Sequence, residues 1–417
     1  MRMKHVVVIG GGVVGLTTAW ALLERGHAVT VVEREASVGL GASRANGGQL
    51  SYRYVSPLAD AGVPLKAVRW LLDPDGPLRF KPEFNSAQWS WLLGFLRACS
   101  GPVNRRTTNR LLELGAYSQA CFSRLHARAD LGDISLREPG KLVVYRKPAE
   151  FARVAARLNG SNGPERALSH DECLALEPAL QDNEAELAGG IFTEGEAVAD
   201  CYALCRQLAE RLTQQPRFRG IVTANVDGFE TANGRIRALR TPQGEIGADE
   251  FVLAAGLQSR ALAKPLGVAL PLYPLKGYSL TVPIEAKHLP PVVSVTDFEK
   301  KILYARIGEQ LRVAAMVDLV GENTRLDPKR VDSLKRAVRD MFPNAADYDR
   351  AEVWAGLRPA TPTSAPILGA TPLGNLWLNV GHGALGFTFS FASAEIVAAH
   401  IDGHVSPVSL DGLRLAA

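Results

Sequence analysis

The stretch HVVVIGGGVVGLTTAWALLERGHAVTVVE, residues 5–33, decides the fold of this chain. Residues 6–9 form a short, continuous apolar run, as a buried parallel strand requires. A glycine-rich turn, GGGVVG at residues 10–15, leads into an apolar helix that is expected to end at about Arg25. A second strand then follows over residues 28–32. Strand, turn, helix and strand in this order predict the first unit of a Rossmann-like α/β sheet.

The turn fits the G-x-G-x-x-G pattern of dinucleotide sites. In that pattern Gly10 permits a tight turn, Gly12 lets the backbone approach a pyrophosphate, and Gly15 lets the helix pack closely on the strand. The helix start offers unpaired N–H groups to the same anion. Glu33 follows Gly15 by 18 positions, near the spacing of about 20 for an acid that binds a ribose hydroxyl. The residues expected to bind the dinucleotide here are Gly10, Gly12, Val13, Val14, Gly15, Glu33 and Arg34.

The same N-terminal letters resemble a signal peptide, because basic residues precede an apolar run. Four glycines interrupt that run, and no small-residue cleavage pattern follows Arg25. A strand, turn and helix therefore explain residues 1–23 better than a leader does. Elsewhere no uninterrupted apolar stretch reaches the ~18 residues of a membrane span, so no transmembrane helix is expected.

The amino-acid composition limits the classes of protein to which this chain can belong. A length of 417 residues suggests two or three domains, and 47% hydrophobic with 22% charged residues is typical of globular proteins. A net charge of +4 is too small to predict nucleic-acid binding. The five cysteines form no CxxC pair or Cys/His cluster, so we expect no metal site and a reducing, cytoplasmic compartment.

A second glycine-rich segment at residues 39–48 favours FAD over NAD. Such a segment can lay backbone N–H groups along a long cofactor, whereas an NAD enzyme more often proceeds directly to its next strand. A flexible loop is the alternative that these letters leave open. Glu33 makes NADP less favoured, because it suits a free ribose hydroxyl. The residues expected to contact FAD in this segment are Ser43, Ala45, Asn46, Gly47, Gly48, Gln49 and Leu50.

Two distant segments point to the same cofactor. Residues 251–256 are expected to form a buried strand that ends in small residues. Residues 376–380 are expected to form another strand, followed by GHGALG at 381–386 and an apolar helix over about 388–401. A glycine-rich loop that runs into a helix start stabilises negative charge, as on a reduced flavin ring. The expected cofactor contacts in these distant parts are Val226, Ala255, Gly256, Gly381, His382, Gly383, Leu385, Gly386, Phe387 and Thr388.

Several runs together resemble the bacterial FAD-dependent D-amino-acid dehydrogenases, within the D-amino-acid oxidase and glycine oxidase superfamily. These runs are GGGVVG (10–15), ANGGQLS (45–51), GVPLKAVRWL (62–71), YPLKGYSLTVPI (273–284), WAGLRPATP (354–362) and LWLNVGHGALG (376–386). The resemblance implies a glutathione-reductase-like FAD-binding domain and an α+β substrate domain built on an antiparallel sheet. Their expected extents are 1–52, 168–268 and 350–417 for the first domain, and 53–167 and 269–349 for the second.

The resemblance also implies oxidative deamination, by hydride transfer from the α-carbon of a D-amino acid to flavin N5. Arg358 then matches the arginine that binds the substrate carboxylate, because its fork makes two parallel, charge-assisted bonds. No base is evident from the sequence; Tyr54, Tyr278 and His382 are candidates by position, although a structural role is favoured for His382. Lys276 either shapes the pocket or is a solvated surface lysine. No cysteine follows Cys205, so non-covalent FAD is expected.

Departures from the family pattern concern the substrate more than the reaction. Tyr52 and Arg53 stand where smaller residues are usual, and Phe387 stands where the family has Trp. D-alanine, D-proline and a hydroxyproline are all open as substrates. A glycine, sarcosine or imino-acid oxidase of the same fold is the main alternative, and a nicotinamide dehydrogenase or a non-enzymatic FAD protein are further ones.

Residues 65–98 group large apolar side chains, including Trp89 and Trp91, with basic ones. A dehydrogenase needs an electron acceptor other than oxygen, so this segment is a candidate contact for a quinone and for the inner face of the cell membrane. Packing of helices against the substrate domain is the alternative, and the sequence favours it slightly.

Overall fold

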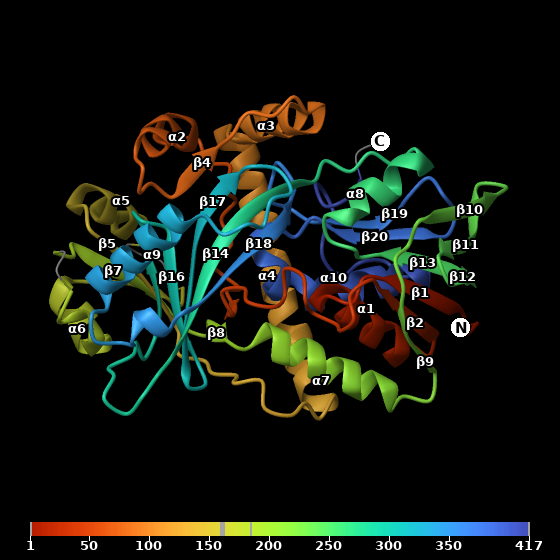
Figure 1. Ribbon diagram of the computed structural model, residues 1–417, viewed down its shortest axis with the longest axis horizontal. Helices are drawn as coiled ribbons and strands as arrows, with labels where there is room; N and C mark the ends of the chain where they lie inside the picture. The colour runs from red at the N-terminus through yellow and green to blue at the C-terminus, as the bar shows by residue number, and fades with distance from the viewer. Residues whose placement is uncertain (1, 159–162, 184–185, 416–417) are drawn as a thin grey trace.

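The computed structural model of the protein describes residues 2–158, 163–183 and 186–415. Two large sheets lie next to each other, one in each half of Figure 1, and helices cover their outer faces. Both the N-terminus and the hairpin β10–β11 lie at the end of the molecule farthest from the second sheet.

The first sheet has six strands in the order β19-β20-β13-β1-β2-β9. All neighbours are parallel except β19, which is antiparallel to β20. The predicted Rossmann-like sheet is therefore confirmed. Its strands are β1 (His5–Ile9), β2 (Ala28–Glu33), β9 (Phe218–Thr223), β13 (Glu250–Leu253), β19 (Ile367–Ala370) and β20 (Leu376–Val380).

Both faces of this sheet are covered, which explains the continuous apolar run in β1. Val6 and Val8 pack in a cluster with the helices, whereas Val7 and Ile9 pack in a cluster on the opposite face. Apolar residues on both faces are what a buried parallel strand needs. The helices are α1 (Val13–Glu24), α4 (Gly101–Arg128), α7 (Cys201–Thr213) and α10 (Gly386–Ile401). Cys201 and Cys205 lie in this core as free thiols.

A small antiparallel sheet lies over the opposite face. It contains β10 (Gly228–Ala232), β11 (Arg235–Thr241) and β12 (Gly244–Gly247), followed by α8 (Gln258–Ala263) and η2 (Lys264–Leu266). Asn233 and Gly234 form the turn between β10 and β11, and both have positive φ, 53° and 71°. β9 begins at Phe218, which pairs with Val29.

The second sheet has nine strands and is mostly antiparallel, as the resemblance implied. Its order is β18-β14-β17-β16-β15-β5-β7-β6, with β4 pairing to β17. The helix α9 (Pro328–Met341) packs against one face, and the other face borders the first sheet. The strands are β4 (Leu78–Phe80), β5 (Lys141–Tyr145), β6 (Glu165–Leu168), β7 (Gly189–Thr193), β14 (Tyr273–Pro283), β15 (Ser294–Asp297), β16 (Ile302–Ile307), β17 (Gln310–Leu319) and β18 (Glu352–Ala360).

The remaining elements connect or cover the sheets. β3 (Gln49–Leu50) pairs with β8 (Ala197–Val198). The others are α2 (Val63–Leu72), α3 (Ser86–Ala98), α5 (Pro148–Leu158), α6 (His170–Leu176), η1 (Pro178–Leu180), η3 (Tyr348–Arg350) and η4 (Gly383–Leu385). Two strands, β7 and β18, pair in the second sheet although the expected FAD-binding segments contain them. The domain boundaries themselves stay a prediction.

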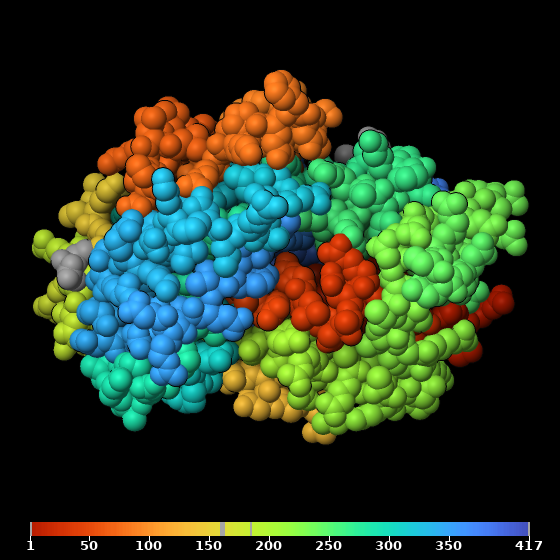
Figure 2. Space-filling model, in the orientation of Figure 1, coloured from red at the N-terminus to blue at the C-terminus, as the bar shows by residue number. Residues whose placement is uncertain are grey.

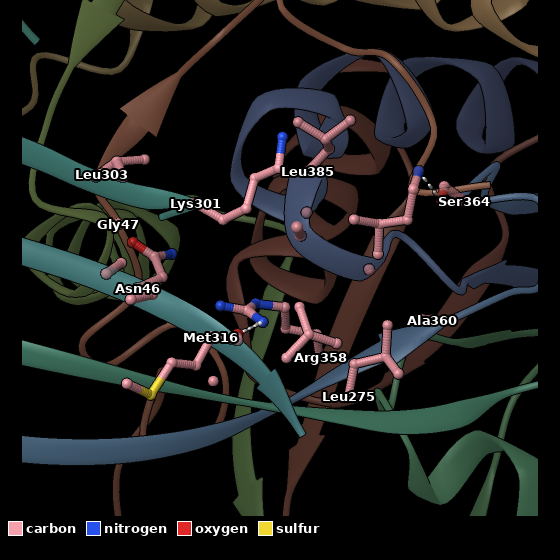
Figure 3. Close-up of a pocket in the computed structure, with 18 of the residues that line it drawn as sticks. Asn46, Gly47, Leu275, Lys301, Leu303, Met316, Arg358, Ala360, Ser364 and Leu385 are labelled. Carbon is pink, nitrogen blue, oxygen red and sulfur yellow. Dashed lines mark hydrogen bonds between the residues drawn. The ribbon is translucent and has the colours of Figure 1, made fainter. Parts of the chain in front are cut away.

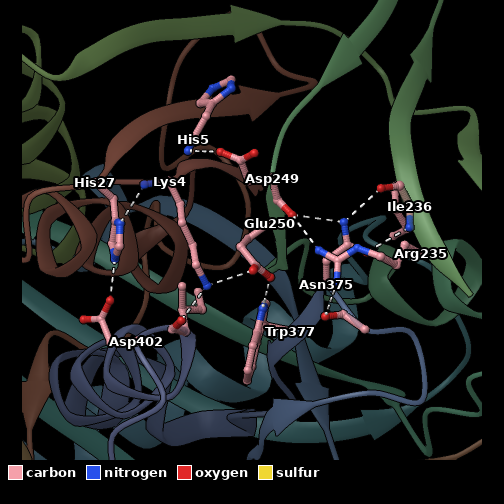
Figure 4. A network of polar contacts seen from close by, with 12 residues as sticks. Lys4, His5, His27, Arg235, Ile236, Asp249, Glu250, Asn375, Trp377 and Asp402 are labelled. Atoms are coloured by element: carbon pink, nitrogen blue, oxygen red, sulfur yellow. Dashed lines mark hydrogen bonds and ion pairs between the residues drawn. The ribbon is translucent and has the colours of Figure 1, made fainter. Parts of the chain in front are cut away.

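A polar network fixes the start of β1 within the fold (Figure 4). Lys4 Nζ lies 2.9 Å from Glu250 Oε1, and Trp377 Nε1 donates to Glu250 Oε2 over 2.8 Å. His27 Nε2 lies 2.8 Å from Asp402 Oδ1, next to α10. The N-terminal residues thus take part in the core of the first sheet, as strand and helix.

By length and composition, one helix in the described part of the chain is apolar enough to cross a membrane. It comprises Gly383–Ile401, and 72% of the window is buried inside the fold. Its apolar residues pack on α1 and α4, so burial within the protein accounts for its composition.

Candidate functional site

A cavity with a volume of about 2500 Å³ runs between the two sheets. Single ligand sites usually measure about 300–1,000 Å³, so this cavity has room for an extended cofactor together with a second molecule. The hollow in the surface is visible in Figure 2 beside the N-terminal segment coloured red.

The glycine turn opens one end of the cavity. Gly10 has φ 116°, and a Cβ on Gly15 would lie 1.8 Å from the carbonyl oxygen of Gly10. This close approach explains why both positions must be glycine. Gly12 begins α1 without a side-chain cap, and no acidic residue lies in the first turn. The helix start therefore presents N–H groups to the cavity, as an anion site does.

Glu33 ends β2 at the edge of the cavity. Its Oε2 accepts a hydrogen bond from Gly11 N over 2.5 Å, and its Oε1 accepts one from Glu35 N over 2.9 Å. These two bonds fix a carboxylate at the place where a dinucleotide ribose is expected. Arg34 also lines the cavity and pairs with Glu35 over 3.1 Å.

The second glycine-rich segment is tied down at several points. Val13 N donates to Ser43 Oγ over 3.1 Å, and Arg312 Nη1 donates to the carbonyl oxygen of Asn46 over 2.7 Å. Asn46 Oδ1 accepts from Gly48 N over 2.9 Å. These bonds join the segment to α1 and to β17. The structure therefore favours the predicted cofactor segment over a loose loop.

Most of the predicted cofactor residues line this one cavity. From the early segments these are Gly10, Gly12, Val13, Val14, Glu33, Arg34, Ser43, Ala45, Asn46, Gly47, Gly48 and Gln49. From the later segments they are Val226, Ala255, Gly256, Gly381, His382, Gly383, Leu385, Gly386, Phe387 and Thr388. Two expectations need correction: Gly15 packs beneath Gly10, and Leu50 is fully buried in the core. These two residues support the site without lining it.

These residues fit FAD. An uncapped helix start for the pyrophosphate, a fixed carboxylate for the ribose and a lining that extends to η4 match the parts of a long dinucleotide in order. None of the five cysteines lines the cavity, and the described residues include no group that could hold a metal ion.

Arg358 on β18 reaches across the second sheet into the cavity (Figure 3). Its guanidinium lies over Gly277, where a Cβ would come within 2.2 Å of Nη2. Nη1 donates to the carbonyl oxygen of Met316 over 2.8 Å. Burial, opposed by the charge of Asp318, lowers the pKa of Arg358 to about 10, so the group stays cationic at neutral pH. In the described ranges no carboxylate forms an ion pair with it.

A bulge in β17 positions the carbonyl group of Met316 that accepts the hydrogen bond from Arg358. One residue of β14, Gly277, lies between Lys276 and Tyr278, whereas two residues of β17, Met316 and Val317, lie between their partners Ala315 and Asp318. Met316 lies in the bulge with φ 68°, which is unusual for a residue with a side chain. No feature of the amino-acid sequence indicated this bulge.

Two candidate catalytic residues, Lys276 and Tyr278, lie on the face of β14 opposite Arg358, although Tyr278 still borders the cavity. β14 pairs regularly with β18, so Leu275 and Gly277 share a face with Arg358, and Lys276 and Tyr278 point away from it. Tyr278 packs in the cluster beneath α9, and its hydroxyl has no partner in the described structure. Lys276 Nζ donates to the carbonyl oxygen of Arg325, so it is neither a pocket residue nor a solvated one.

The candidate bases His382 and Tyr54 also line the cavity, but neither is suited to accept a proton. Burial lowers the pKa of His382 to about 3, and its Nε2 lies 3.1 Å from Ser393 Oγ within α10. Burial raises the pKa of Tyr54 to about 12. His382 therefore stays a neutral ring and Tyr54 a neutral phenol across the working pH range, which supports structural roles.

Sequence reasoning missed Lys141, a buried lysine on β5. Its Nζ donates to Gln49 Oε1 over 2.6 Å and to Ser51 Oγ over 3.2 Å, and lies 4.1 Å from the centroid of the Tyr54 ring. Burial lowers its pKa to about 7, although Glu196 opposes the shift. The sequence did not single out Lys141, because KLVVY at residues 141–145 has the pattern of an ordinary strand.

Glu196 was also missed, and it fixes the chain next to the cofactor segment. Its carboxylate accepts hydrogen bonds from Tyr52 N over 2.7 Å and from Arg53 N over 2.8 Å. Arg53 consequently lines the cavity with its guanidinium free of any ion pair to a described residue.

Comparisons with known proteins agree with this site. The family described as DAO, FAD dependent oxidoreductase, matches residues 5–400. The "D-amino acid dehydrogenase 2" of Pseudomonas aeruginosa is 48% identical over 410 residues, which cover 98% of each chain. The "D-amino acid dehydrogenase" of Paramagnetospirillum magneticum is 43% identical over 416 residues, again 98% of each chain.

Solved structures share the fold at lower identity. Glycine oxidase from Geobacillus kaustophilus superimposes with a TM-score of 0.76 at 22% identity, covering 100% of this chain and 99% of that one. L-proline dehydrogenase from P. horikoshii gives 0.74 at 17% identity, covering 98% and 96%. The chain therefore belongs to the DAO family of FAD dependent oxidoreductases, in the group whose named members are D-amino acid dehydrogenases.

Proposed function

We propose that this FAD-dependent oxidoreductase deaminates D-amino acids and that Arg358 binds their carboxylate. In the balanced reaction, a D-amino acid and water yield a 2-oxo acid and ammonia, and two electrons with two protons pass to an acceptor. A cyclic amino acid such as D-proline would stop at the cyclic imine. Bound FAD supplies the group that takes the hydride from the α-carbon. The names of the similar relatives support this substrate class.

The observation that carries the proposal is the position of Arg358. A cationic fork that enters the cavity without a carboxylate partner is suited to bind a substrate carboxylate by two charge-assisted bonds. The hydrogen bond to Met316 holds one arm and leaves other N–H groups of the guanidinium directed at the cavity. The bulge and the space above Gly277 thus support a carboxylate site at the tip of Arg358.

The reacting amine must lose its ammonium proton before hydride transfer. None of the candidates Tyr54, Tyr278 and His382 is suited to act as the base, but Arg358 places positive charge at the cavity. Nearby positive charge lowers the pKa of an ammonium group. We therefore expect the substrate to bind with a neutral amine, its proton having passed to solvent.

Anaerobic reduction of the bound flavin tests the proposal. Purified holoprotein is mixed separately with D-alanine, D-proline, D-hydroxyproline, glycine, sarcosine and the L-isomers, and the flavin absorbance is followed. Reduction by D-isomers alone is the expected result. Reduction by glycine and sarcosine instead, with rapid reoxidation when air is admitted, would establish the oxidase alternative. A flavin that none of these compounds reduces would overturn the proposal.

We also propose that α2 and α3 touch the membrane surface and that a quinone accepts the electrons there. No residue of α2 is buried, and Leu65 and Leu72 are 83% and 79% exposed. On α3, Trp91 packs inward and donates to the carbonyl oxygen of Ala360, whereas Trp89 is 51% exposed. Packing against the protein interior therefore accounts for the apolar residues on only one side of α3.

Sedimentation with vesicles tests this contact. The matched variants are Leu72→Gln with Trp89→Gln on the surface and Val405→Gln as the control, since Val405 is exposed at a distant site. Vesicles contain anionic phospholipid with ubiquinone. We expect the double variant to stay in the supernatant while the control sediments. Equal sedimentation of both proteins, or sedimentation of neither the wild type nor the control, would refute the contact.

A further inference from the structure

A second cation, Lys301, enters the cavity that Arg358 enters (Figure 3). It ends the turn between β15 and β16 and has φ 56°. Its Nζ lies 3.7 Å from the centroid of the Phe298 ring. Burial and, next, the charge of Lys66 lower the pKa of Lys301 to about 8, against the attraction of Glu299, Asp297 and Glu150. The amine is therefore mostly charged at neutral pH.

Three of the carboxylates around Lys301 are paired with other cations. The pairs are Asp297 with Arg146 at 2.8 Å, Asp340 with Lys300 at 3.2 Å, and Glu150 with Lys66 at 3.1 Å. Glu299 attracts Lys301 from a distance, and its Oε2 accepts only a backbone hydrogen bond, from Arg146 N over 3.0 Å. Within the described residues Lys301 makes no ion pair of its own, so its direct partner is an aromatic face.

The sheet places the two cations close together. Leu303, two residues after Lys301, pairs with Ala314, which is two residues before Met316. Met316 is the residue whose carbonyl accepts from Arg358. Neighbouring strands lie about 4.8 Å apart. The side chain of Arg358 extends from β18 over Gly277 of β14 to Met316 of β17, so its guanidinium ends about one strand spacing from the backbone of Lys301 beside β16. The carboxylates of a five-carbon dicarboxylic acid can bridge such a span.

We infer that Lys301 binds the side-chain carboxylate of an acidic D-amino acid while Arg358 binds its α-carboxylate. The inference rests on the proposed function and specifies its substrate class. A neutral side chain in the same place would leave the partly desolvated ammonium without an ion-pair partner, which is costly. D-glutamate should therefore be preferred over D-glutamine, which has the same shape without the charge.

The ratio of kcat/KM for D-glutamate to that for D-glutamine tests the inference. It is measured with an artificial electron acceptor on the holoenzyme and on three variants, Lys301→Met, Lys301→Arg and Lys300→Met. Lys300 is the matched control, because it is adjacent in sequence but pairs with Asp340. We expect a ratio of at least ten in the wild type, in Lys301→Arg and in the control, and a ratio near one in Lys301→Met.

A binding measurement separates this inference from the proposed function. Glutarate and butyrate are titrated into each holoprotein, and the change in flavin absorbance gives their dissociation constants. Glutarate should bind at least tenfold more tightly than butyrate, and Lys301→Met should abolish the difference.

Equal binding of the two acids by the wild type, or a difference that survives in Lys301→Met, would overturn the role of Lys301. If no D-amino acid reduces the flavin, the proposed function fails, and the titration still decides whether Lys301 binds a second carboxylate.

Discussion

Replacing Gly277 by alanine should damage carboxylate binding without unfolding the protein. The new Cβ would lie 2.2 Å from Arg358 Nη2, 2.5 Å from Cζ and 2.8 Å from Nη1. These atoms are the tip of a flexible side chain, so the guanidinium can move aside. Gly277 has no positive φ, and alanine fits its backbone.

The magnitude follows from the contact distances. Ordinary contact begins at 3.4 Å, so Nη2 must retreat by at least 3.4 − 2.2 = 1.2 Å. Such a shift breaks the alignment of at least one charge-assisted bond to a carboxylate. That bond is worth about 1.5–3 kcal/mol, which predicts a rise in KM of about 10- to 150-fold.

Steady-state kinetics with a D-amino acid and an artificial acceptor provide the assay. Arg358→Leu and the double variant complete a mutant cycle, and Gly247→Ala is the control because its Cβ meets only Arg237 O at an ordinary 3.5 Å. In the Arg358→Leu background, Gly277→Ala should add almost nothing, since the displaced group is gone. Additive effects in the cycle, or an unchanged KM in the single variant, would refute the reasoning. FAD content should stay at the wild-type level.

Three more outcomes are expected. Glu33→Ala should weaken FAD binding about tenfold, because it removes the carboxylate held by Gly11 N and directed at the ribose; equilibrium dialysis measures this, and unchanged affinity would argue against that role. Heat denaturation followed by dialysis should release all of the flavin, whereas colour retained on the polypeptide would reveal a covalent bond. The pKa of Lys141 is about 7 in the folded protein against an ordinary 10.5, so between these pH values the unfolded chain binds more protons than the folded one. The free energy of unfolding, relative to that of Lys141→Met, should therefore rise with pH across this window by up to about 5 kcal/mol. Thermal unfolding of both proteins at pH 7 and pH 9.5 measures this difference, and a pH-independent gap would show that the lysine is not desolvated.

The nucleotide end of the site could be read from the sequence because its chemistry is local. A turn at Gly10, an open helix start at Gly12 and a carboxylate at Glu33 lie within one supersecondary unit, and their spacing follows from backbone geometry. The glycine-rich loop at 381–386 could be predicted equally well, because it connects the end of a strand to the start of a helix.

The substrate end of the site could be predicted only in part from the sequence. Arg358 was identified through the resemblance, and the structure gives it a setting that supports the role. Lys276 and Tyr278 lie on the face opposite Arg358, and the sequence could not show this because a matching position does not state which way a side chain points from its strand. Lys141 and Lys301 could not be predicted as site residues, because an isolated lysine in a strand or turn belongs to no recognisable sequence motif.

The sequence by itself determined the Rossmann-like unit, because short-range periodicity and glycine spacing specify it. The cofactor and the family followed from the resemblance of several separate runs. Tertiary structure alone decided which cations enter the cavity. Pairing of β14 with β18 and the bulge at Met316 direct Arg358 to one side and turn Lys276 to the other. That outcome depends on strands distant in sequence, and on which neighbouring carboxylates are already neutralised, so it exists only once the sheet has formed.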